Sequence, residues 1–223
     1  MRETIDSTII SAFLDPKHTA VLIIDMQNGF VHADSNMGKA WGTERQRSII
    51  PQIKTLIETA RSRNLPIFWS KQVYLKHDIT RIQRRRLTGH HTRQRFVPCL
   101  EGSWEVDIVD DLRPLIHEDD YVIIKHRASF FQETQLPAIL RYYGIDTCLV
   151  SGVNTEFCIE TSVRDGYMRD FNMVVVEECV NSSRPGFHRD TLDKIQAYFG
   201  EVVSVDQLNT LFLETTATTS GES

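Results

Sequence analysis

The chain alternates short apolar runs with segments of helical periodicity, and this alternation restricts the folds it can adopt. The run Thr19–Ile24 is apolar and rich in β-branched residues and stops abruptly at Asp25, and Tyr121–Ile124 stops in the same way at Lys125. Continuous apolar runs are typical of parallel strands that helices cover on both faces. We therefore predict an α/β fold: a doubly wound, mostly parallel six-stranded sheet with helices on both faces. We expect strands near 20–24, 66–70, 121–124, 147–151, 173–177 and 202–204, and helices near 46–63, 104–111, 133–143, 158–170 and 187–198.

Composition predicts one domain over residues 16–213, after an N-terminal extension at 1–15. Residues 71–102 are the least regular and most basic part, and we interpret them as a solvated insertion, a subunit contact or a lid over the site. A polybasic run suggests nucleic acid. However, the net charge is −5 and no aromatic-interleaved motif accompanies the arginines, so we expect no nucleic-acid partner. Residues 214–223 are small and polar, which predicts a disordered tail.

The location of the protein follows from what its sequence does not contain. The N-terminus does not resemble a signal peptide, and no apolar run approaches the ~20 residues that cross a bilayer, so we expect a cytoplasmic protein without membrane contact. The cysteines have neither close pairing nor C-x-x-C spacing, which indicates no disulfide framework and no zinc cluster. Cys148 and Cys179 are predicted to pack in the core, while Cys99 is either an inert thiol or a residue near the mouth of the site.

Cys158 lies where a buried strand passes into a helix, after the glycine-containing turn at Gly152. Helix N-terminal amides lower a thiol pKa, which would make the sulfur a nucleophile. The alternative is a small apolar residue that packs the turn. Asp25 and Lys125 also follow strands, and ligands bind at the carboxyl edge of an open parallel sheet. We therefore expect Asp25, Lys125 and Cys158 to converge.

Three segments carry a resemblance to a known family. Ile23–Phe30, Ile124–Phe131 and Ser151–Cys158 look like the ordered signature segments of the isochorismatase-like hydrolase superfamily, in its cysteine hydrolase branch. The resemblance runs from about Pro16 to Leu211. It implies that Asp25, Lys125 and Cys158 are the family's catalytic triad, and that a cis peptide bond joins Val153 to Asn154.

The chemistry of these three groups fits hydrolysis of an amide. A thiolate of Cys158 attacks a carbonyl carbon, while Asp25 takes the thiol proton and later delivers it to the departing nitrogen. Lys125 supplies the compensating positive charge. The N–H groups of Phe157 and Cys158 are predicted to hold the oxyanion. Water then resolves the thioester, with Asp25 as the base.

Within the cysteine branch, the segment 125–136 most resembles ureidoacrylate amidohydrolases, with biuret hydrolases and N-carbamoylsarcosine amidases more distantly similar. The resemblance implies a small ureido or amide substrate and a homo-oligomer, either dimer or tetramer. The alternatives are a hydrolase of a larger amide or lactam natural product and a nicotinamidase-like amidase. The vinyl-ether-cleaving isochorismatases lack the nucleophile, so Cys158 argues against that activity.

Further residues are candidates for substrate contact. Arg127 either grips a substrate carboxylate or pairs with Glu156 or Asp25. Asn154 and Thr155 either contact the substrate or cap the helix. Three aromatic residues at strand ends form either the pocket wall or the core, namely Phe30, Trp69 and Phe131. The remaining candidates are Gln27, Val153 and Phe157.

We expect no metal and no cofactor. The nicotinamidase branch holds a metal through an Asp-x-His type motif after the second strand, but residues 69–74 here place Lys71 and Gln72 where a carboxylate and an imidazole are needed. His77, His90 and His91 lack partners at a ligand spacing.

Overall fold

The computed structural model describes residues 14–78 and 96–219, with side chains described as far as residue 213. Its centre is a sheet of six strands in the order β3-β2-β1-β4-β5-β6, with parallel pairing between all neighbours. The predicted fold class is confirmed, and the sheet is wholly parallel. The strands are β1 (Thr19–Ile24), β2 (Ile67–Gln72), β3 (Tyr121–Lys125), β4 (Thr147–Val153), β5 (Asn172–Asn181) and β6 (Glu201–Val203).

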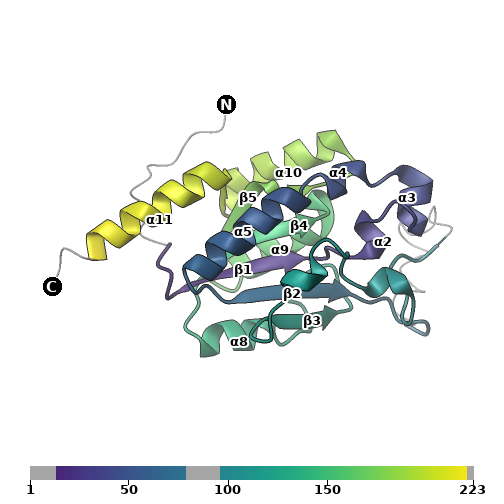
Figure 1. Ribbon diagram of the computed structural model, residues 1–223, viewed down its shortest axis with the longest axis horizontal. Helices are drawn as coiled ribbons and strands as arrows, with labels where there is room; N and C mark the ends of the chain where they lie inside the picture. Colours follow the sequence, from purple (N-terminus) through teal and green to yellow (C-terminus); the bar gives the residue numbers. More distant parts are fainter. Residues whose placement is uncertain (1–13, 79–95, 220–223) are drawn as a thin grey trace.

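Helices cover both faces of the sheet (Figure 1). One core contains α5 (Ile50–Ser62) and α11 (Val205–Thr219), and the other contains α8 (Leu136–Tyr142), α9 (Glu160–Tyr167) and α10 (Pro185–Tyr198). A helix docks on a sheet through an apolar stripe at helical spacing. The buried residues of α5 are Ile50, Ile53, Leu56, Ile57 and Ala60.

The central strand β1 explains why the apolar runs are continuous. Val21 and Ile23 pack into the core on the α5 side, while Leu22 and Ile24 pack into the core on the opposite side. Successive side chains of a strand point to opposite faces. Because helices cover both faces here, every position of β1 must be apolar or small, and all six residues are buried.

The order of the strands creates one switch point. From β1 the chain extends the sheet through β2 to β3, and it then returns to place β4 on the other side of β1. β1 pairs with β4 along its whole length, from Thr19 beside Thr147 to Ile24 beside Gly152. In open parallel sheets, ligands bind outside the carboxyl ends of the strands at such a point. The carboxyl ends of β1 and β4 are therefore the place to look for a site.

The structure differs from two of the predicted helices. The segment 46–63 is broken into α4 (Glu44–Arg47) and α5, which has Pro51 as its second residue. Proline donates no N–H, so it suits a helix start and not a helix interior. The predicted helix 104–111 is wrong: only a 3₁₀ turn, Trp104–Val106, forms there, and Ile108 pairs with Gln27 in an extended bridge.

Three helices were not predicted: α2 (Asn28–Val31), α3 (Asn36–Trp41) and α11. The first two are too short to show a periodic apolar pattern. α11 continues to Thr219, inside the segment 214–223 that was expected to be disordered. Its Leu208 and Phe212 are buried against the core of the α5 face, and extending an anchored helix requires no new nucleus.

Most of the basic insertion 71–102 lies outside the described residues, including every arginine and the pair His90 and His91. Its two ends are described, and backbone hydrogen bonds join them. The Tyr74 N–H donates to the Cys99 carbonyl, and the Tyr74 carbonyl accepts from the Glu101 N–H.

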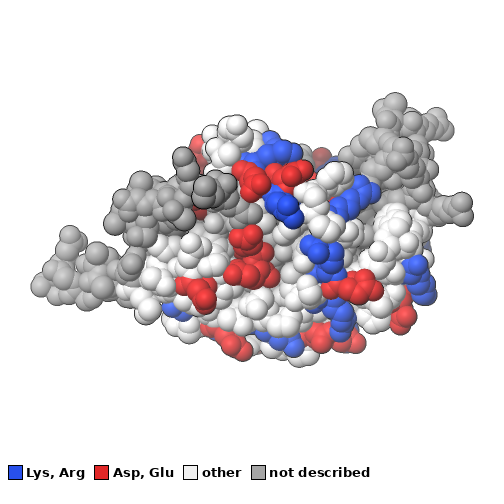
Figure 2. Space-filling model, turned by 90° about the horizontal axis from the view of Figure 1, so that it is seen from above, with Lys and Arg blue, Asp and Glu red and all other residues white. Residues whose placement is uncertain are grey.

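On the face drawn in Figure 2, the acidic and basic side chains that the structure describes are interspersed. None of the described helices is both long and apolar enough to cross a membrane.

Candidate active site

The three side chains predicted to converge do meet at the carboxyl ends of the strands. Asp25 directly follows β1, Lys125 is the last residue of β3, and Cys158 lies in a π-helical turn, Thr155–Ile159, that follows β4. All three are buried. The Lys125 Nζ lies 2.8 Å from the Asp25 Oδ2 and 3.6 Å from the Cys158 Sγ. Residues from three distant parts of the chain thus form one contiguous group.

Asp25 is held in an unusual conformation by its neighbour on β2. Its φ is 56°, in the left-handed region that few residues other than glycine, asparagine and aspartate adopt. The Ser70 hydroxyl accepts a hydrogen bond from the Asp25 N–H at 3.0 Å and donates one to its Oδ1 at 2.6 Å. Ser70 therefore fixes both the backbone and the carboxylate, which leaves Oδ2 facing the lysine.

The Lys125 ammonium is fully engaged. Besides Asp25, it donates to the Gln72 Oε1 at 2.9 Å and to the carbonyls of Arg127 and Ala128 at 3.1 and 3.0 Å. Burial acts to lower the pKa of Lys125, but the neighbouring Asp25 carboxylate and the Cys158 sulfur outweigh it, so the net pKa lies above its usual value. The contacts of Lys125 therefore hold its ammonium group in place beside Asp25.

The environment of Cys158 contradicts one sequence expectation. Its pKa was predicted to fall, but burial raises it; the charge of Lys125 acts against that rise, and Asp25 adds to it. The dipole argument fails because Cys158 lies inside a tight π turn and is removed from water, and burial is the larger effect. The resting sulfur is therefore a neutral thiol beside a carboxylate.

The backbone around the nucleophile has two notable features. The peptide bond between Val153 and Asn154 is cis, as the resemblance implied. The Phe157 N–H, predicted as an oxyanion donor, already donates to the Asn154 carbonyl at 3.0 Å. Of the predicted pair of donors, the Cys158 N–H remains a candidate. The Ser162 hydroxyl donates to the Cys158 carbonyl at 2.6 Å and anchors the turn to α9.

The other cysteines are structural. Cys99, Cys148 and Cys179 are buried, and burial raises the pKa of each thiol. Cys99 donates from its sulfur to the Glu105 carbonyl at 3.2 Å and does not line the cavity over Cys158. Packing was the expected role of Cys148 and Cys179, and inertness was one of the two interpretations of Cys99.

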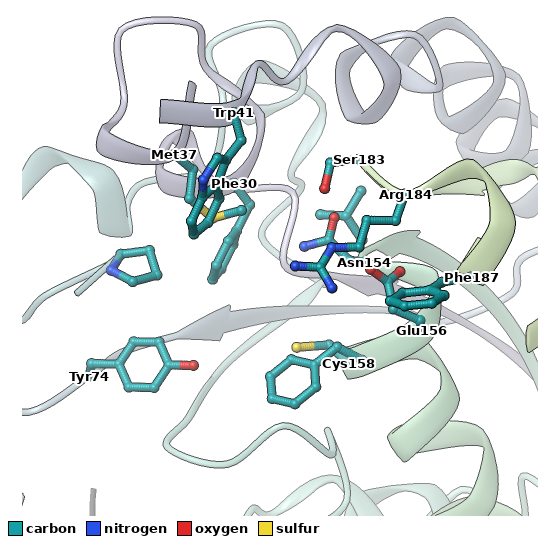
Figure 3. A pocket seen from close by; sticks show the side chains of 13 residues that line it. Phe30, Met37, Trp41, Tyr74, Asn154, Glu156, Cys158, Ser183, Arg184 and Phe187 are labelled. Carbon is teal, nitrogen blue, oxygen red and sulfur yellow. The ribbon is translucent and has the colours of Figure 1, made fainter. Parts of the chain in front are cut away.

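A cavity of about 340 Å³ opens over Cys158. Figure 3 shows the sulfur pointing into it, with the Tyr74 hydroxyl on one side and Arg184 and Phe187 on the other. Aromatic and aliphatic groups with a few polar ones are typical of a small-molecule site. The lining residues are Phe30, Met37, Trp41, Tyr74, Pro98, Val153, Asn154, Glu156, Phe157, Cys158, Ser183, Arg184 and Phe187.

Four of the predicted contact residues line this cavity, namely Phe30, Val153, Asn154 and Phe157. Trp69 and Phe131 do not, and the structure gives them the alternative role in the core. Trp69 is buried on the α5 face and donates from its indole to the Asp120 carboxylate at 3.0 Å. Phe131 packs against Phe171 with ring centroids 5.5 Å apart.

Arg127 has neither of its predicted partners. Its guanidinium lies 3.6 Å from the Asp78 carboxylate and 3.4 Å from the Glu133 carboxylate, and it does not line the cavity. The predicted pairing is wrong because Asp78, which follows β2, and Glu133 lie nearer to the guanidinium. Gln27 is likewise a brace: its amide donates to the carbonyls of Gln72 and Val106.

Thr155 and Asn154 are held from other elements. The Thr155 hydroxyl lies 2.8 Å from the His188 Nδ1 on α10, and the Asn154 Oδ1 accepts a hydrogen bond from the Gln46 amide at 3.2 Å. Both contacts position the turn that carries Cys158. Asn154 also faces the cavity, so it keeps the predicted role of a substrate contact as a candidate.

Sequence reasoning missed several lining residues. Met37 and Trp41 belong to α3, which gave no pattern, and Tyr74 follows β2. Arg184 and Ser183 follow β5, so the rule that located Asp25 and Lys125 at strand ends also applies to them.

Among the described residues, no group of three or more metal-ligating side chains is arranged to hold a metal ion. The absence of a metal remains a prediction.

The comparisons with known proteins now bear on this geometry. The model of the isochorismatase domain matches residues 19–207, which is most of the chain. The chain belongs to the isochorismatase family. This result places Asp25, Lys125 and Cys158 inside the matched region of a family of hydrolases, so the protein is an enzyme, as predicted.

Two ureidoacrylate amidohydrolases are similar to this chain over most of its length. Ureidoacrylate amidohydrolase RutB of Pantoea ananatis is 29% identical over 202 residues, covering 85% of this chain and 80% of that protein. The protein of the same name from Serratia proteamaculans is 29% identical over 216 residues, covering 88% and 84%.

Solved structures of two hydrolases share the fold of this chain. A cysteine hydrolase from Pseudomonas syringae superposes with a TM-score of 0.74 at 22% identity, covering 89% of this chain and 96% of that one. N-carbamoylsarcosine amidase from Thermoplasma acidophilum superposes with a TM-score of 0.67 at 25% identity, covering 83% and 95%.

Proposed function

We propose that this protein is a cysteine-dependent amidohydrolase that cleaves a C–N bond of a small ureido or amide substrate through a thioester intermediate. The observation that carries the proposal is the position of the Lys125 Nζ, 2.8 Å from the Asp25 Oδ2 and 3.6 Å from the Cys158 Sγ beneath a cavity. A nucleophile, an acid–base group and a fixed charge in contact are the parts that acyl transfer needs.

The first step begins from a neutral thiol. Because burial raises the pKa of Cys158, the sulfur loses its proton only as it attacks. Asp25 accepts that proton while the S–C bond forms at the carbonyl carbon. The ammonium of Lys125 then lies beside the charge that develops at the sulfur, and its pKa above the usual value keeps it protonated throughout.

The second half of the reaction reverses these roles. The tetrahedral oxygen accepts a hydrogen bond from the Cys158 N–H. The C–N bond breaks as Asp25 returns its proton to the nitrogen, which leaves as ammonia or an amine. A water molecule next gives a proton to Asp25 and attacks the thioester carbon. The C–S bond then breaks as Asp25 returns that proton to the sulfur, which releases the acid and restores the thiol and the carboxylate.

The size of the cavity favours a small substrate over the larger amide or lactam that is the alternative. A volume of about 340 Å³ lies at the lower end of the range typical of ligand sites. The named activity of the two similar amidohydrolases supports a ureido acid in particular. A nicotinamidase-like substrate has no specific observation in its favour here. Cytoplasmic location and assembly into a dimer or tetramer remain predictions.

The test is the replacement Cys158→Ser, assayed for ammonia release over ureido acids, biuret, carbamoylated amino acids and maleamate. We expect turnover to fall by about a thousandfold or more, because a hydroxyl is a far poorer nucleophile at neutral pH. Wild-type enzyme should also yield a covalent adduct on Cys158 when quenched in acid during turnover. Cys148→Ser is the control, since that thiol is equally buried and does not line the cavity.

A further inference from the structure

The cavity contains one acidic and one basic side chain that the proposed mechanism does not use. Glu156 lies in the same π turn as Cys158, two residues before it, and Arg184 precedes α10. Figure 3 shows the guanidinium of Arg184 extending over the cavity, with Glu156 beside Phe187 and the sulfur of Cys158 below. The two charged groups come from neighbouring strand ends, so their positions relative to the nucleophile are set by the sheet.

Glu156 has an oxygen that lacks a donor. Its Oε2 is buried and accepts no hydrogen bond from any residue that the structure describes. A buried acceptor without a donor is costly, so such an atom calls for an explanation. The explanation we favour is a ligand N–H, because Glu156 lines the cavity and the backbone of a tight turn fixes its separation from Cys158.

Arg184 is the basic counterpart. Its guanidinium lies 5.3 Å from the centre of the Phe187 ring, and it forms no ion pair with the described acidic residues. In contrast, Arg47, Arg61 and Arg164 each pair with a carboxylate. A guanidinium supported on a ring and left without an anion presents a planar pair of donors that matches a carboxylate.

We infer that Arg184 and Glu156 are the specificity residues of this cavity, and that they select a ureido acid. The carboxylate of the substrate pairs with Arg184, a ureido N–H donates to Glu156, and the ureido carbonyl carbon faces the Cys158 sulfur. This inference rests on the proposed function and names its substrate class. A neutral amide would leave Arg184 without an anion, and a simple acid amide would leave the Glu156 oxygen without its donor.

The Arg184 half is tested with a matched pair of substrates, 3-ureidopropionate and its neutral amide. Arg184→Gln should lower kcat/KM for the acid about 10- to 100-fold, the size of a lost charged hydrogen bond. For the neutral amide we expect less than about a threefold change. Arg189→Gln is the control, because Arg189 lies on α10 and does not line the cavity. Equal losses on both substrates would overturn the role of Arg184.

The Glu156 half uses 3-ureidopropionate against succinamate, a carboxylic acid amide that lacks the second ureido nitrogen. Glu156→Gln keeps the volume and removes the charge of the acceptor. It should lower kcat/KM about tenfold for the ureido acid and leave succinamate within about twofold. If kcat/KM for succinamate fell by the same factor, Glu156 would support the turn and would not bind the ureido group.

A readout without turnover separates this inference from the proposed function. Alkylation of Cys158 by anionic iodoacetate and neutral iodoacetamide is followed from the mass of its peptide, at one pH. The ratio of the two rates should fall about threefold or more in Arg184→Gln and stay unchanged in Arg189→Gln, because only the first removes a charge at the cavity. If no amide is hydrolysed and the ratio still falls, the anion site stands and the proposed function alone fails. An unchanged ratio overturns the site.

Discussion

At the scale of single residues, the triad is a buried ion pair with a thiol beside it. Asp25 and Lys125 are both fully removed from water, and each compensates the charge of the other. Burial of a lone charge costs several kcal/mol, so loss of one partner leaves the other unstable in place. The two residues that we propose for catalysis therefore also affect the stability of the sheet edge.

A double-variant cycle tests this coupling. Asp25→Asn should reduce kcat about 10²- to 10⁴-fold, because it removes the acid–base group while keeping its shape. Lys125→Met should reduce kcat as severely and also lower the free energy of unfolding by about 3–5 kcal/mol, since Asp25 is left uncompensated. The variant with both changes should be no slower than either single one and more stable than Lys125→Met alone. The measurements are kcat and the urea concentration at the midpoint of unfolding for each variant. If the loss of kcat in the double variant equalled the product of the two single losses, the residues would not act as a single catalytic unit.

The pH dependence of Cys158 follows from its raised pKa. A raised pKa means that the folded protein keeps the thiol proton above the pH at which an unfolded thiol, with a pKa of about 8.5, has lost it. The rate of iodoacetamide labelling at Cys158 should thus rise about tenfold per pH unit from about pH 7 to pH 9 without levelling off. The exposed thiol of a short peptide under the same conditions should level off above about pH 9. Labelling of Cys158 that is already constant at neutral pH would show that its pKa is lowered.

At the scale of elements, the site depends on the close approach of β1 and β4. Gly152 has a φ of 113°, and a Cβ at this position would lie 2.0 Å from the Ile24 carbonyl oxygen. No side chain can be accommodated there without moving one of the two strands that carry Asp25 and lead to Cys158. A glycine in a strand often marks this kind of contact.

Gly152→Ala should lower the free energy of unfolding by about 3 kcal/mol or more, since both overpacking and a positive φ contribute. Gly186→Ala is the matched control. It lies in α10, where an added methyl group would have no neighbouring atom within 4 Å, so its effect should stay within about 0.5 kcal/mol. Urea unfolding followed by circular dichroism measures both. A Gly152→Ala protein as stable as the wild type would mean that β1 and β4 can separate freely.

The elements also show where sequence reasoning succeeds. The strand β1 is apolar on both faces because all its positions are buried, and this made it recognisable in the sequence. The rule for strand ends then placed Asp25 and Lys125 correctly. Arg127 was misplaced because its partner Asp78 follows β2, far away in the chain. Short helices such as α3, and the region around Ile108, depend on tertiary contacts that local patterns do not encode.

At the scale of the whole molecule, the topology explains why one edge gathers all the chemistry. Every strand is parallel, so every carboxyl end faces the same side, and the switch between β1 and β4 opens a crevice there. The ends of β1, β2, β3 and β4 supply the triad and its supports, and the segment after β5 supplies Arg184. The sequence could predict this convergence, but the volume and lining of the cavity depend on how distant loops pack.

The same edge of the sheet is unsuited to a metal ion. Where a metal-dependent relative would need an imidazole, the Gln72 Oε1 accepts a hydrogen bond from the Lys125 ammonium, and Lys71 lies 3.4 Å from the Asp107 carboxylate. A cation bound there would face two lysines, and like charges at short range repel strongly in a buried site. We therefore expect full activity after prolonged dialysis against EDTA, and less than about a tenth of an equivalent of zinc, iron or manganese in the purified protein by elemental analysis. Activity that is lost on dialysis and regained with zinc would contradict this, and it would direct attention to His90 and His91, which lie outside the described residues.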